Sequence, residues 1–229
     1  MRENRLDLYV DGDKNKQVSF VVRKLINAGY TGRNQKEVKK HVDELKEMGV
    51  PAPESVPTYY LKSSMLLTTD DFYEVVDEDS TGEAEYALLI GKNRIYVAVG
   101  SDHTDRKLEI TSIPKAKQLS PNFISSSVWL FEDVKEQWDE IELRSWIGRG
   151  RDTLYQEATL AAFMRPEELL ERVKALLGGN LEEGTVIFSG TVGALVKGMP
   201  FSDSFEVELL DRNKNRSLTC GYNLQVLEL

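Results

Sequence analysis

The feature that most constrains the fold of this chain is a pair of acidic residues, Glu83 and Glu85, at the head of an apolar segment. The segment continues to residue 90 with apolar and aromatic side chains and precedes a turn. Because the side chains of a strand alternate between its two faces, both carboxylates project from the same side. A second apolar segment, residues 95–99, follows the turn, and an acidic residue returns at Asp102. This pattern predicts a β-hairpin that carries acidic groups on one face.

The turn between the two segments sets which residues face each other. If residues 92–93 form a two-residue loop, Glu85 lies opposite Gly100. The same register places Glu83 opposite Asp102. Like charges in such positions, with Cβ atoms about 5 Å apart, destabilise a ladder unless a cation compensates them. An all-oxygen ligand set suits Mg²⁺, Mn²⁺ or Ca²⁺. The hairpin thus predicts a divalent-cation site, and the alternative is a solvated acidic rim in a chain with 38 Asp and Glu residues.

Length and composition are typical of a soluble globular protein with one sizeable core. The chain has 229 residues, 41% of them hydrophobic, and a net charge of −9. This charge argues against nucleic acid or an anionic membrane as a partner, and no apolar run approaches the roughly 20 residues that cross a bilayer. The first residues lead into a strand-like stretch instead of a signal peptide, and the single cysteine, Cys220, cannot form an internal disulfide. We therefore expect a cytoplasmic protein in which Cys220 packs in a strand.

Hydrophobic periodicity predicts a β-rich α+β fold in which strands outnumber helices. Besides the hairpin, strand patterns occupy residues 17–23, 59–69, 72–76, 141–147, 186–189, 205–210 and 224–227. Two helices are expected, over residues 35–48 and 166–177, because each apolar stripe of helical spacing ends at a glycine. Turn and loop patterns occupy residues 77–82, 111–127 and 148–152.

A proline-rich connector, residues 50–57, marks the expected domain boundary. Proline fixes the backbone angle φ and removes an amide donor, so the segment is stiff and interrupts regular structure. It separates a small N-terminal lobe, residues 1–57, from residues 58–229, which carry the acidic hairpin.

Histidines are candidates for proton transfer, and the chain has 2 of them. His41 lies in the expected helix with Glu44 three residues later, so the two side chains share one face. A carboxylate bound to one imidazole nitrogen leaves the other nitrogen basic near neutral pH, as a general base requires. The alternative is a surface pair without function. His103 follows Asp102 and would point to the opposite face of its strand, so we expect a structural role for it.

Five segments, in order, resemble those of the fumarylacetoacetate hydrolase superfamily. They are His-x-x-Glu at residues 41–44, Glu-x-Glu followed by Gly-Lys at 83–92, Asp-x-Thr-x-Arg at 102–106, Lys117-Gln118, and Leu-x-x-Gly-x-x-Ile-x-x-Gly-Thr at 181–191. Two positions depart from the superfamily pattern: Thr185 stands where it has Asp, and Val192 stands where it commonly has Pro. More closely, the chain resembles a branch recorded only as a domain of unknown function.

The resemblance implies a mixed β-sandwich roll with a small N-terminal lobe. Residues 1–57 would form this lobe with its lid helix, and residues 58–229 would form the metal-binding catalytic domain. It also implies a divalent cation, Mg²⁺ or Mn²⁺ or else Ca²⁺, held by Glu83, Glu85 and Asp102, and a homodimer.

The same resemblance implies a site for a small 2-oxo acid. His41 would act as the base, oriented by Glu44, and Lys117 would bring a positive charge to the reacting oxygen. Further candidates for binding the substrate are Arg33, Lys62, Arg106 and Thr191. As alternatives, the three cationic residues belong to the surface and Thr191 is an ordinary turn residue.

Three functions stay open on these grounds. The favoured one is a metal-dependent hydrolase that cleaves a C–C bond in an acylpyruvate or β-dicarbonyl acid through a metal-stabilised enolate. The second is a lyase or isomerase of a 2-oxo acid on the same site, for example a decarboxylase or a hydratase/dehydratase. The third is a non-catalytic protein that a metal stabilises.

Overall fold

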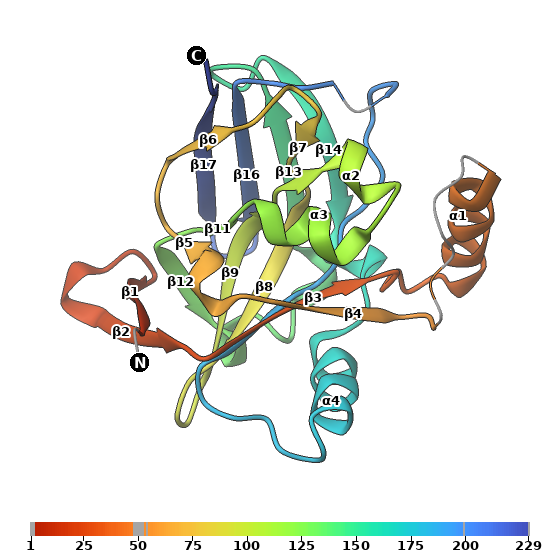
Figure 1. Ribbon diagram of the computed structural model, residues 1–229. Helices are drawn as coiled ribbons and strands as arrows, with labels where there is room; N and C mark the ends of the chain where they lie inside the picture. Colours follow the sequence, from red (N-terminus) through yellow and green to blue (C-terminus); the bar gives the residue numbers. More distant parts are fainter. Residues whose placement is uncertain (1–2, 48–52, 54, 199, 229) are drawn as a thin grey trace.

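Two packed β-sheets form the centre of the protein in a computed structural model (Figure 1). The structure describes residues 3–47, 53, 55–198 and 200–228. The side chains of His41 and of residues 44–47 lie outside the described part.

The larger sheet has ten strands and contains the acidic hairpin. Its main order is β2 (Gln17–Val22), β1 (Asn4–Val10), β12 (Ser127–Leu130), β9 (Ile95–Asp102), β8 (Ala84–Ile90), β15 (Thr185–Phe188), β3 (Lys24–Gly29) and β4 (Thr58–Lys62). Two short strands extend it: β11 (Asn122–Ile124) pairs with β9, and β5 (Leu67–Thr68) pairs with β11.

The second sheet has five strands and covers one face of the hairpin. Its order is β14 (Thr153–Thr159), β13 (Glu142–Ile147), β16 (Ser204–Asp211), β17 (Arg216–Val226) and β6 (Phe72–Val75). A separate two-stranded ladder joins β7 (Ser80–Thr81) to β10 (Thr104–Asp105).

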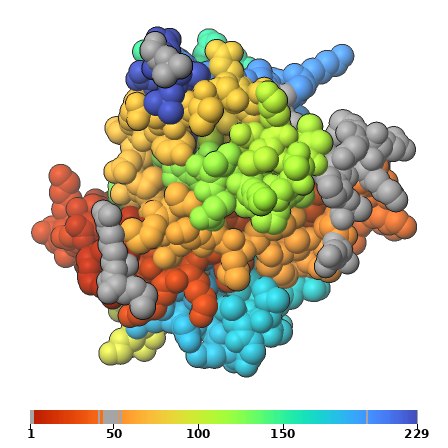
Figure 2. Space-filling model, in the orientation of Figure 1, coloured from red at the N-terminus to blue at the C-terminus, as the bar shows by residue number. Residues whose placement is uncertain are grey.

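Four α-helices lie outside the sheets in the part of the chain that the structure describes. They are α1 (Gln35–Glu47), α2 (Arg106–Glu109), α3 (Ile113–Leu119) and α4 (Pro166–Leu176). In Figure 1, α2 and α3 lie in front of β8 and β9, whereas α1 and α4 lie at the periphery. Figure 2 shows the green α2–α3 segment at the surface of this face, beside the orange segment that precedes β7. Five single 3₁₀ turns complete the secondary structure, at residues 14–16, 64–66, 131–133, 138–140 and 160–162.

The hairpin is buried on both faces, which explains its nearly continuous apolar sequence. Tyr86 and Leu88 face a core between the two sheets, together with Val207 and Leu209 of β16. Ala87 and Leu89 face a second core that β1, β2 and β3 close from the other side. The polar end of the second face, beyond these apolar residues, is where Glu83 and Glu85 lie.

Most of the expected elements are present, with boundaries that shift by a few residues. The strand expected at 17–23 is β2, the helix expected at 35–48 is α1 as far as it is described, and the helix expected at 166–177 is α4. The last strand, expected at 224–227, begins much earlier, at Arg216. Cys220 lies buried in this strand, as predicted.

The prediction of a loop-rich segment over residues 111–127 is wrong. This segment contains the helix α3 and the strand β11. Pro114 in the first turn of α3 marks its start, but both elements are too short for a hydrophobic period to show. The polar turn expected at 77–82 likewise contains the two-residue strand β7.

Strands from both sides of the proline-rich connector share the larger sheet, because β3 pairs with β4. Residues 50–52 and 54 of the connector lie outside the described residues, and the division into domains 1–57 and 58–229 stays a prediction. Among the described residues, none of the helices has the length and apolar character that a membrane crossing requires.

Candidate metal centre

The acidic hairpin has the register that its sequence predicts. In the antiparallel pair β8–β9, Glu85 lies opposite Gly100. The amide of Asp102 donates to the carbonyl oxygen of Glu83 at 3.1 Å, so the pairing extends to these two residues. Both predicted pairs are therefore confirmed.

Three carboxylates meet at the open end of this hairpin. We call Glu83, Glu85 and Asp102 the carboxylate cluster; one oxygen of each lies within 4.8 Å of the others. Glu85 and Asp102 are buried and Glu83 is half-buried. Ligands on opposite sides of one ion lie about 4 Å apart for Mg²⁺ and about 5 Å apart for Ca²⁺. The cluster can therefore hold a divalent cation.

The glycine opposite Glu85 lets a third strand approach the cluster. A Cβ atom at Gly100 would lie 2.3 Å from the carbonyl oxygen of Phe123, a backbone atom that cannot move aside. Without that side chain, β11 packs directly on β9 and places Asn122 opposite Asp102. The backbone requirement at Gly100 thus brings an amide side chain to the carboxylates.

Two buried lysines contact the cluster. Lys117 on α3 bridges two carboxylates, with Nζ 2.5 Å from Asp102 Oδ2 and 3.0 Å from Glu83 Oε2. Lys62 at the end of β4 lies with Nζ 3.2 Å from Asp102 Oδ1 and 2.5 Å from Asn122 Oδ1. The structure therefore places two of the sequence-predicted cations, Lys62 and Lys117, directly on the candidate ligands.

Burial affects the two lysines differently. Burial lowers the pKa of Lys62 below its ordinary value, and the attraction of Asp102 compensates only part of that effect. Burial also opposes the charge of Lys117, but Asp102, Glu83 and Glu85 together raise its pKa above the ordinary value. Lys117 is consequently held in its charged form by the carboxylates.

Glu83 is paired with two cations. Arg106 donates from Nη1 to Glu83 Oε1 at 3.0 Å, and the same nitrogen contacts Glu109 Oε2 at 3.0 Å. Burial would raise the pKa of Glu83, but the charges of Lys117 and Arg106 lower it to about 2. Glu83 is therefore ionised at any pH at which the protein would be studied.

Glu85 is the uncompensated member of the cluster. Its Oε2 accepts a hydrogen bond from the amide of Gly190 at 2.7 Å, and it makes no ion pair within the described part of the chain. Burial, with the neighbouring charges of Asp102 and Glu83, raises its pKa well above the ordinary value. A buried carboxylate that resists ionisation beside two others fits a site completed by a divalent cation.

Several residues at the cluster have no counterpart among the sequence predictions. Asn122 and Asn27 exchange a side-chain hydrogen bond, with Asn122 Nδ2 donating to Asn27 Oδ1 at 3.0 Å. Tyr60 pairs with Asn27 across β3 and β4 and stands two residues before Lys62, on the same face of the strand. The only sequence signal for Tyr60 is this spacing, and the contact between the two asparagines follows from strand packing alone.

Tyr30 also lies near the carboxylate cluster, and its backbone conformation is unusual. Its φ is 58°, in the left-handed region that an aromatic residue rarely adopts. Burial, then Tyr60, Glu109 and Glu83, raises the pKa of its phenol to about 12. The strained residue thus places a neutral hydroxyl within electrostatic range of the cluster.

Two residues predicted to bind the substrate, Arg33 and Thr191, form their hydrogen bonds with groups outside the carboxylate cluster. Arg33 forms a two-pronged ion pair with Asp139, at 2.8 Å for each oxygen, and donates to the carbonyl of Phe163. Thr191 donates to the carbonyl of Ala84 at 2.9 Å, next to the cluster along the chain. Neither has a described contact with the carboxylate cluster.

The predicted general base, His41, and its orienting residue, Glu44, lie on α1. Their side chains are outside the described part, so their role stays a prediction. His103 is buried and its Nδ1 lies 3.0 Å from the hydroxyl of Tyr222. Burial, then the charge of Arg106, lowers the pKa of His103 to about 3. It is not part of the carboxylate cluster, which agrees with the structural role expected for it.

A family model described as "Protein of unknown function (DUF2848)" matches residues 28–222 of the chain. The match includes the carboxylate cluster and every site residue that the sequence predicts. No curated protein sequence matches the chain significantly.

Several solved structures share the fold. The crystal structure of Cg1458 is 14% identical with a TM-score of 0.63, and the match covers 93% of this chain and 81% of that one. A 2-keto-3-deoxy-D-arabinonate dehydratase complexed with magnesium and 2,5-dioxopentanoate is 15% identical with a TM-score of 0.62, over 94% of this chain and 79% of that one.

A third similar structure is 4-oxalocrotonate decarboxylase from Pseudomonas putida G7, complexed with calcium and acetate. It is 16% identical with a TM-score of 0.51, over 87% of this chain and 76% of that one. At these identities the likeness establishes the fold alone. It confirms the predicted fold class, a β-rich α+β sandwich roll.

Proposed function

The chain belongs to the family described as "Protein of unknown function (DUF2848)", and from this premise we propose that it is a metal-dependent lyase acting on a small 2-oxo acid. The observation that carries the proposal is the buried cluster of three carboxylates with Lys62 and Lys117 directly bound to it. Such a constellation combines a divalent-cation site with charges that attract an anion.

The charges of the site support an anionic substrate. The three carboxylates of the cluster and Glu109 face three cations, namely Lys62, Lys117 and Arg106, so the group has a net charge of −1 when all are ionised. A bound divalent cation makes it positive, and the surrounding protein excludes the water that would screen this charge. A 2-oxo carboxylate meets this requirement.

Each residue has a proposed role. Glu83, Glu85 and Asp102 hold the cation, and Arg106 keeps Glu83 ionised and fixed. When bound, the cation supplies Lewis-acid stabilisation of negative charge that develops on the 2-oxo oxygen. The Lys117 ammonium group stabilises charge on the same 2-oxo oxygen. Lys62 binds the substrate carboxylate beside Asn122. Tyr30 and Tyr60 are neutral hydroxyl groups within electrostatic range of Glu83.

The likeness to solved enzymes supports a lyase over other reactions on such a site. Two of the structures with this fold are named as a dehydratase and a decarboxylase, and both were solved with a divalent cation. Both reactions leave negative charge beside a 2-oxo group, which the proposed cation and Lys117 would stabilise. Neither reaction consumes a water molecule, so no residue is needed to activate one.

The second candidate is the hydrolase of an acylpyruvate or β-dicarbonyl acid. The observation that favours it is the spacing of His41 and Glu44 on α1, because a base is needed to activate the attacking water. Arg33 and Thr191 belong to this candidate as more distant substrate contacts. A homodimer and a cytoplasmic location stay predictions under either candidate.

The test is an activity screen with Mg²⁺, Mn²⁺ and Ca²⁺ against 2-keto-3-deoxy sugar acids, oxaloacetate and acylpyruvates. Products are followed by mass spectrometry in H₂¹⁸O. A lyase forms product without placing ¹⁸O in a new carboxylate, whereas a C–C hydrolase places it there. Product formation that is unaffected by Glu83→Ala would contradict the proposed site. No product from any of these acids, with metal bound, would favour the non-catalytic protein.

A further inference from the structure

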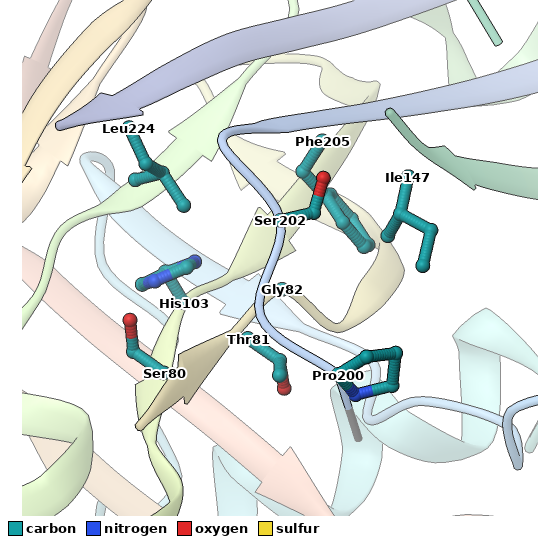
Figure 3. A pocket seen from close by; sticks show the side chains of 9 residues that line it. All are labelled: Ser80, Thr81, Gly82, His103, Ile147, Pro200, Ser202, Phe205 and Leu224. Atoms are coloured by element: carbon teal, nitrogen blue, oxygen red, sulfur yellow. The ribbon is translucent and has the colours of Figure 1, made fainter. Parts of the chain in front are cut away.

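A small cavity adjoins the ladder β7–β10 and His103 (Figure 3). Its volume is about 10 Å³, which is the space of a single water molecule. Two polar atoms of its lining residues, His103 Nε2 and Ser80 Oγ, are buried and have no hydrogen-bond partner among the described protein groups. A buried polar atom without a partner is rare and requires an explanation.

His103 is the end of a chain of hydrogen bonds that reaches the carboxylate cluster. The amide of Glu83 donates to Ser101 Oγ at 3.1 Å. Ser101 Oγ lies 2.9 Å from the hydroxyl of Tyr222, and this hydroxyl lies 3.0 Å from His103 Nδ1. Ser101 and His103 are completely buried and Tyr222 is 2% exposed, so water cannot replace a missing bond from outside.

The number of protons fixes the direction of this chain. Ser101 Oγ already accepts from Glu83, so its own proton can point to Tyr222. The Tyr222 proton then points to His103 Nδ1, which must be an acceptor, and the neutral imidazole carries its proton on Nε2. In the reverse direction, the buried Ser101 hydroxyl would have no acceptor among the described contacts of the chain. An unpaired buried donor is unfavourable, so the first direction is preferred.

We propose that the cavity binds one structural water molecule, which accepts the Nε2 proton of His103 and contacts Ser80 Oγ. The volume excludes larger ligands, and the lining residues are uncharged or apolar, including Ile147, Phe205 and Leu224. An ion therefore finds no counter-charge there, whereas a water molecule finds the two polar partners that it needs.

The water and His103 act on the metal site through this series of hydrogen bonds. Tyr222 is held between His103 and Ser101, and Ser101 holds the backbone amide from which the Glu83 side chain extends. We therefore assign Tyr222 and His103 as positioning residues for Glu83. This assignment rests on the proposed cation site, whereas the water site and the direction of the chain do not.

The direction of the chain is tested by NMR of ¹⁵N-histidine-labelled, metal-free protein. With 2 histidines in the chain, the His41→Gln variant assigns both signals. Long-range ¹H–¹⁵N correlations should show His103 as the Nε2-protonated tautomer, and Tyr222→Phe should shift the Nδ1 resonance, because Nδ1 loses the hydrogen bond that it accepts from Tyr222. A protonated Nδ1 in the wild type, or an Nδ1 resonance that Tyr222→Phe leaves unchanged, would overturn the direction.

The water is tested by a high-resolution crystal structure of the full chain. Density for one water is expected at hydrogen-bond distance from both His103 Nε2 and Ser80 Oγ. Ser80→Ala should leave it with one fewer partner and a higher displacement factor. A direct hydrogen bond between the two side chains, or a cavity without density, would overturn the proposal.

The positioning role is tested by calorimetric titration with Mg²⁺. Tyr222→Phe should weaken Mg²⁺ binding about tenfold, in the range known for residues that orient metal ligands. The matched control is Tyr86→Phe, which also loses one buried phenol bond, at 3.0 Å to the carbonyl of Met164, but lies on the face of β8 that points away from the carboxylate cluster. Equal affinities in Tyr222→Phe and wild type would overturn the positioning role. A wild type that binds no Mg²⁺ would instead count against the proposed function, because the tautomer and the water are measured without metal.

Discussion

The backbone amide of Gly190 donates to the side chain of Glu85 at 2.7 Å, across 105 residues of sequence. Gly190 can do so because its φ is +82° and it packs against the turn after β3. The side chain of Thr31 in that turn donates to the carbonyl of Ser189. In the sequence, Gly190 is recognisable only as part of a Gly-Thr motif. In the structure, its amide holds the Glu85 carboxylate, which has the least charge compensation of the three.

Gly190→Ala should destabilise the protein by about 2–4 kcal/mol, because the added Cβ meets both strain and a collision. It would lie 2.6 Å from Thr31 Oγ1 and 2.9 Å from the carbonyl oxygen of Ala28. Gly178 has a positive φ but open space around it, so Gly178→Ala introduces backbone strain without a collision. Gly193→Ala introduces neither strain nor a collision, so the two controls separate the two effects. Urea denaturation measures all three variants. A Gly190→Ala variant as stable as Gly193→Ala would show that the turn does not pack as described.

Metal binding should depend on each carboxylate of the cluster. Wild type should melt at a higher temperature with millimolar Mg²⁺, Mn²⁺ or Ca²⁺, since a ligand that binds the native state stabilises it, by about 2.7 kcal/mol at 100 times its Kd. Glu83→Ala and Glu85→Ala should lose this response, while Glu183→Ala, an exposed carboxylate outside the cluster, should keep it. A wild-type melting temperature that no divalent cation changes would refute the metal site.

The part of the site that the sequence predicts is the part set by local geometry. A two-residue turn fixes the register of β8 and β9, and register places Glu83, Glu85 and Asp102 together. Lys62 and Lys117 were recognisable by resemblance, but their contacts with Asp102 depend on how β4 and α3 pack on the hairpin.

The rest of the site depends on tertiary packing that leaves no local pattern. Asn27 and Asn122 meet across 95 residues of sequence, and neither stands in a distinctive motif. Tyr30 reaches the site through a left-handed backbone that no periodicity indicates. The helix α3 and the strand β11 were missed because seven and three residues are too few to show a period.

Metal binding should strengthen as pH rises, because of Glu85. Burial and the charges of Asp102 and Glu83 raise its folded-state pKa above the unfolded value of about 4.3. The stability that this protonated group contributes is therefore complete below the unfolded pKa and is lost as pH rises toward the folded pKa. A divalent cation displaces the proton. The melting-temperature increase with Mg²⁺ should be larger at about pH 8 than at about pH 5, and Glu85→Gln should lack this difference. An equal increase at both values in wild type would contradict the prediction.

The two buried lysines should affect substrate binding more than stability. Lys62→Met and Lys117→Met each remove a charge-assisted contact, so kcat/KM should fall by about 10- to 100-fold. If Lys117 meets charge that develops only in the transition state, kcat falls in its variant, whereas Lys62→Met mainly raises KM. The control is Lys24→Met, which loses an ion pair with Glu182 at the surface. Unchanged kinetics in both buried variants would exclude them from the substrate site.

The strongest discrimination between the two candidate reactions comes from comparing His41→Ala with Glu83→Ala on one substrate. Hydrolysis needs an activated water, so loss of the base should reduce kcat by roughly 10²–10⁴-fold, and Glu44→Gln should cost less because the imidazole remains. A simple decarboxylation needs no attacking water and removes no proton from carbon, so under that lyase reaction His41→Ala should keep much of its activity while Glu83→Ala, without its cation ligand, does not. Asp43→Asn, an exposed neighbour on α1, controls for changes to the helix itself. Retained activity in His41→Ala beside an inactive Glu83→Ala supports a decarboxylase. Loss of activity in both supports a reaction that needs a base, which is hydrolysis if ¹⁸O enters a new carboxylate and dehydration if it does not.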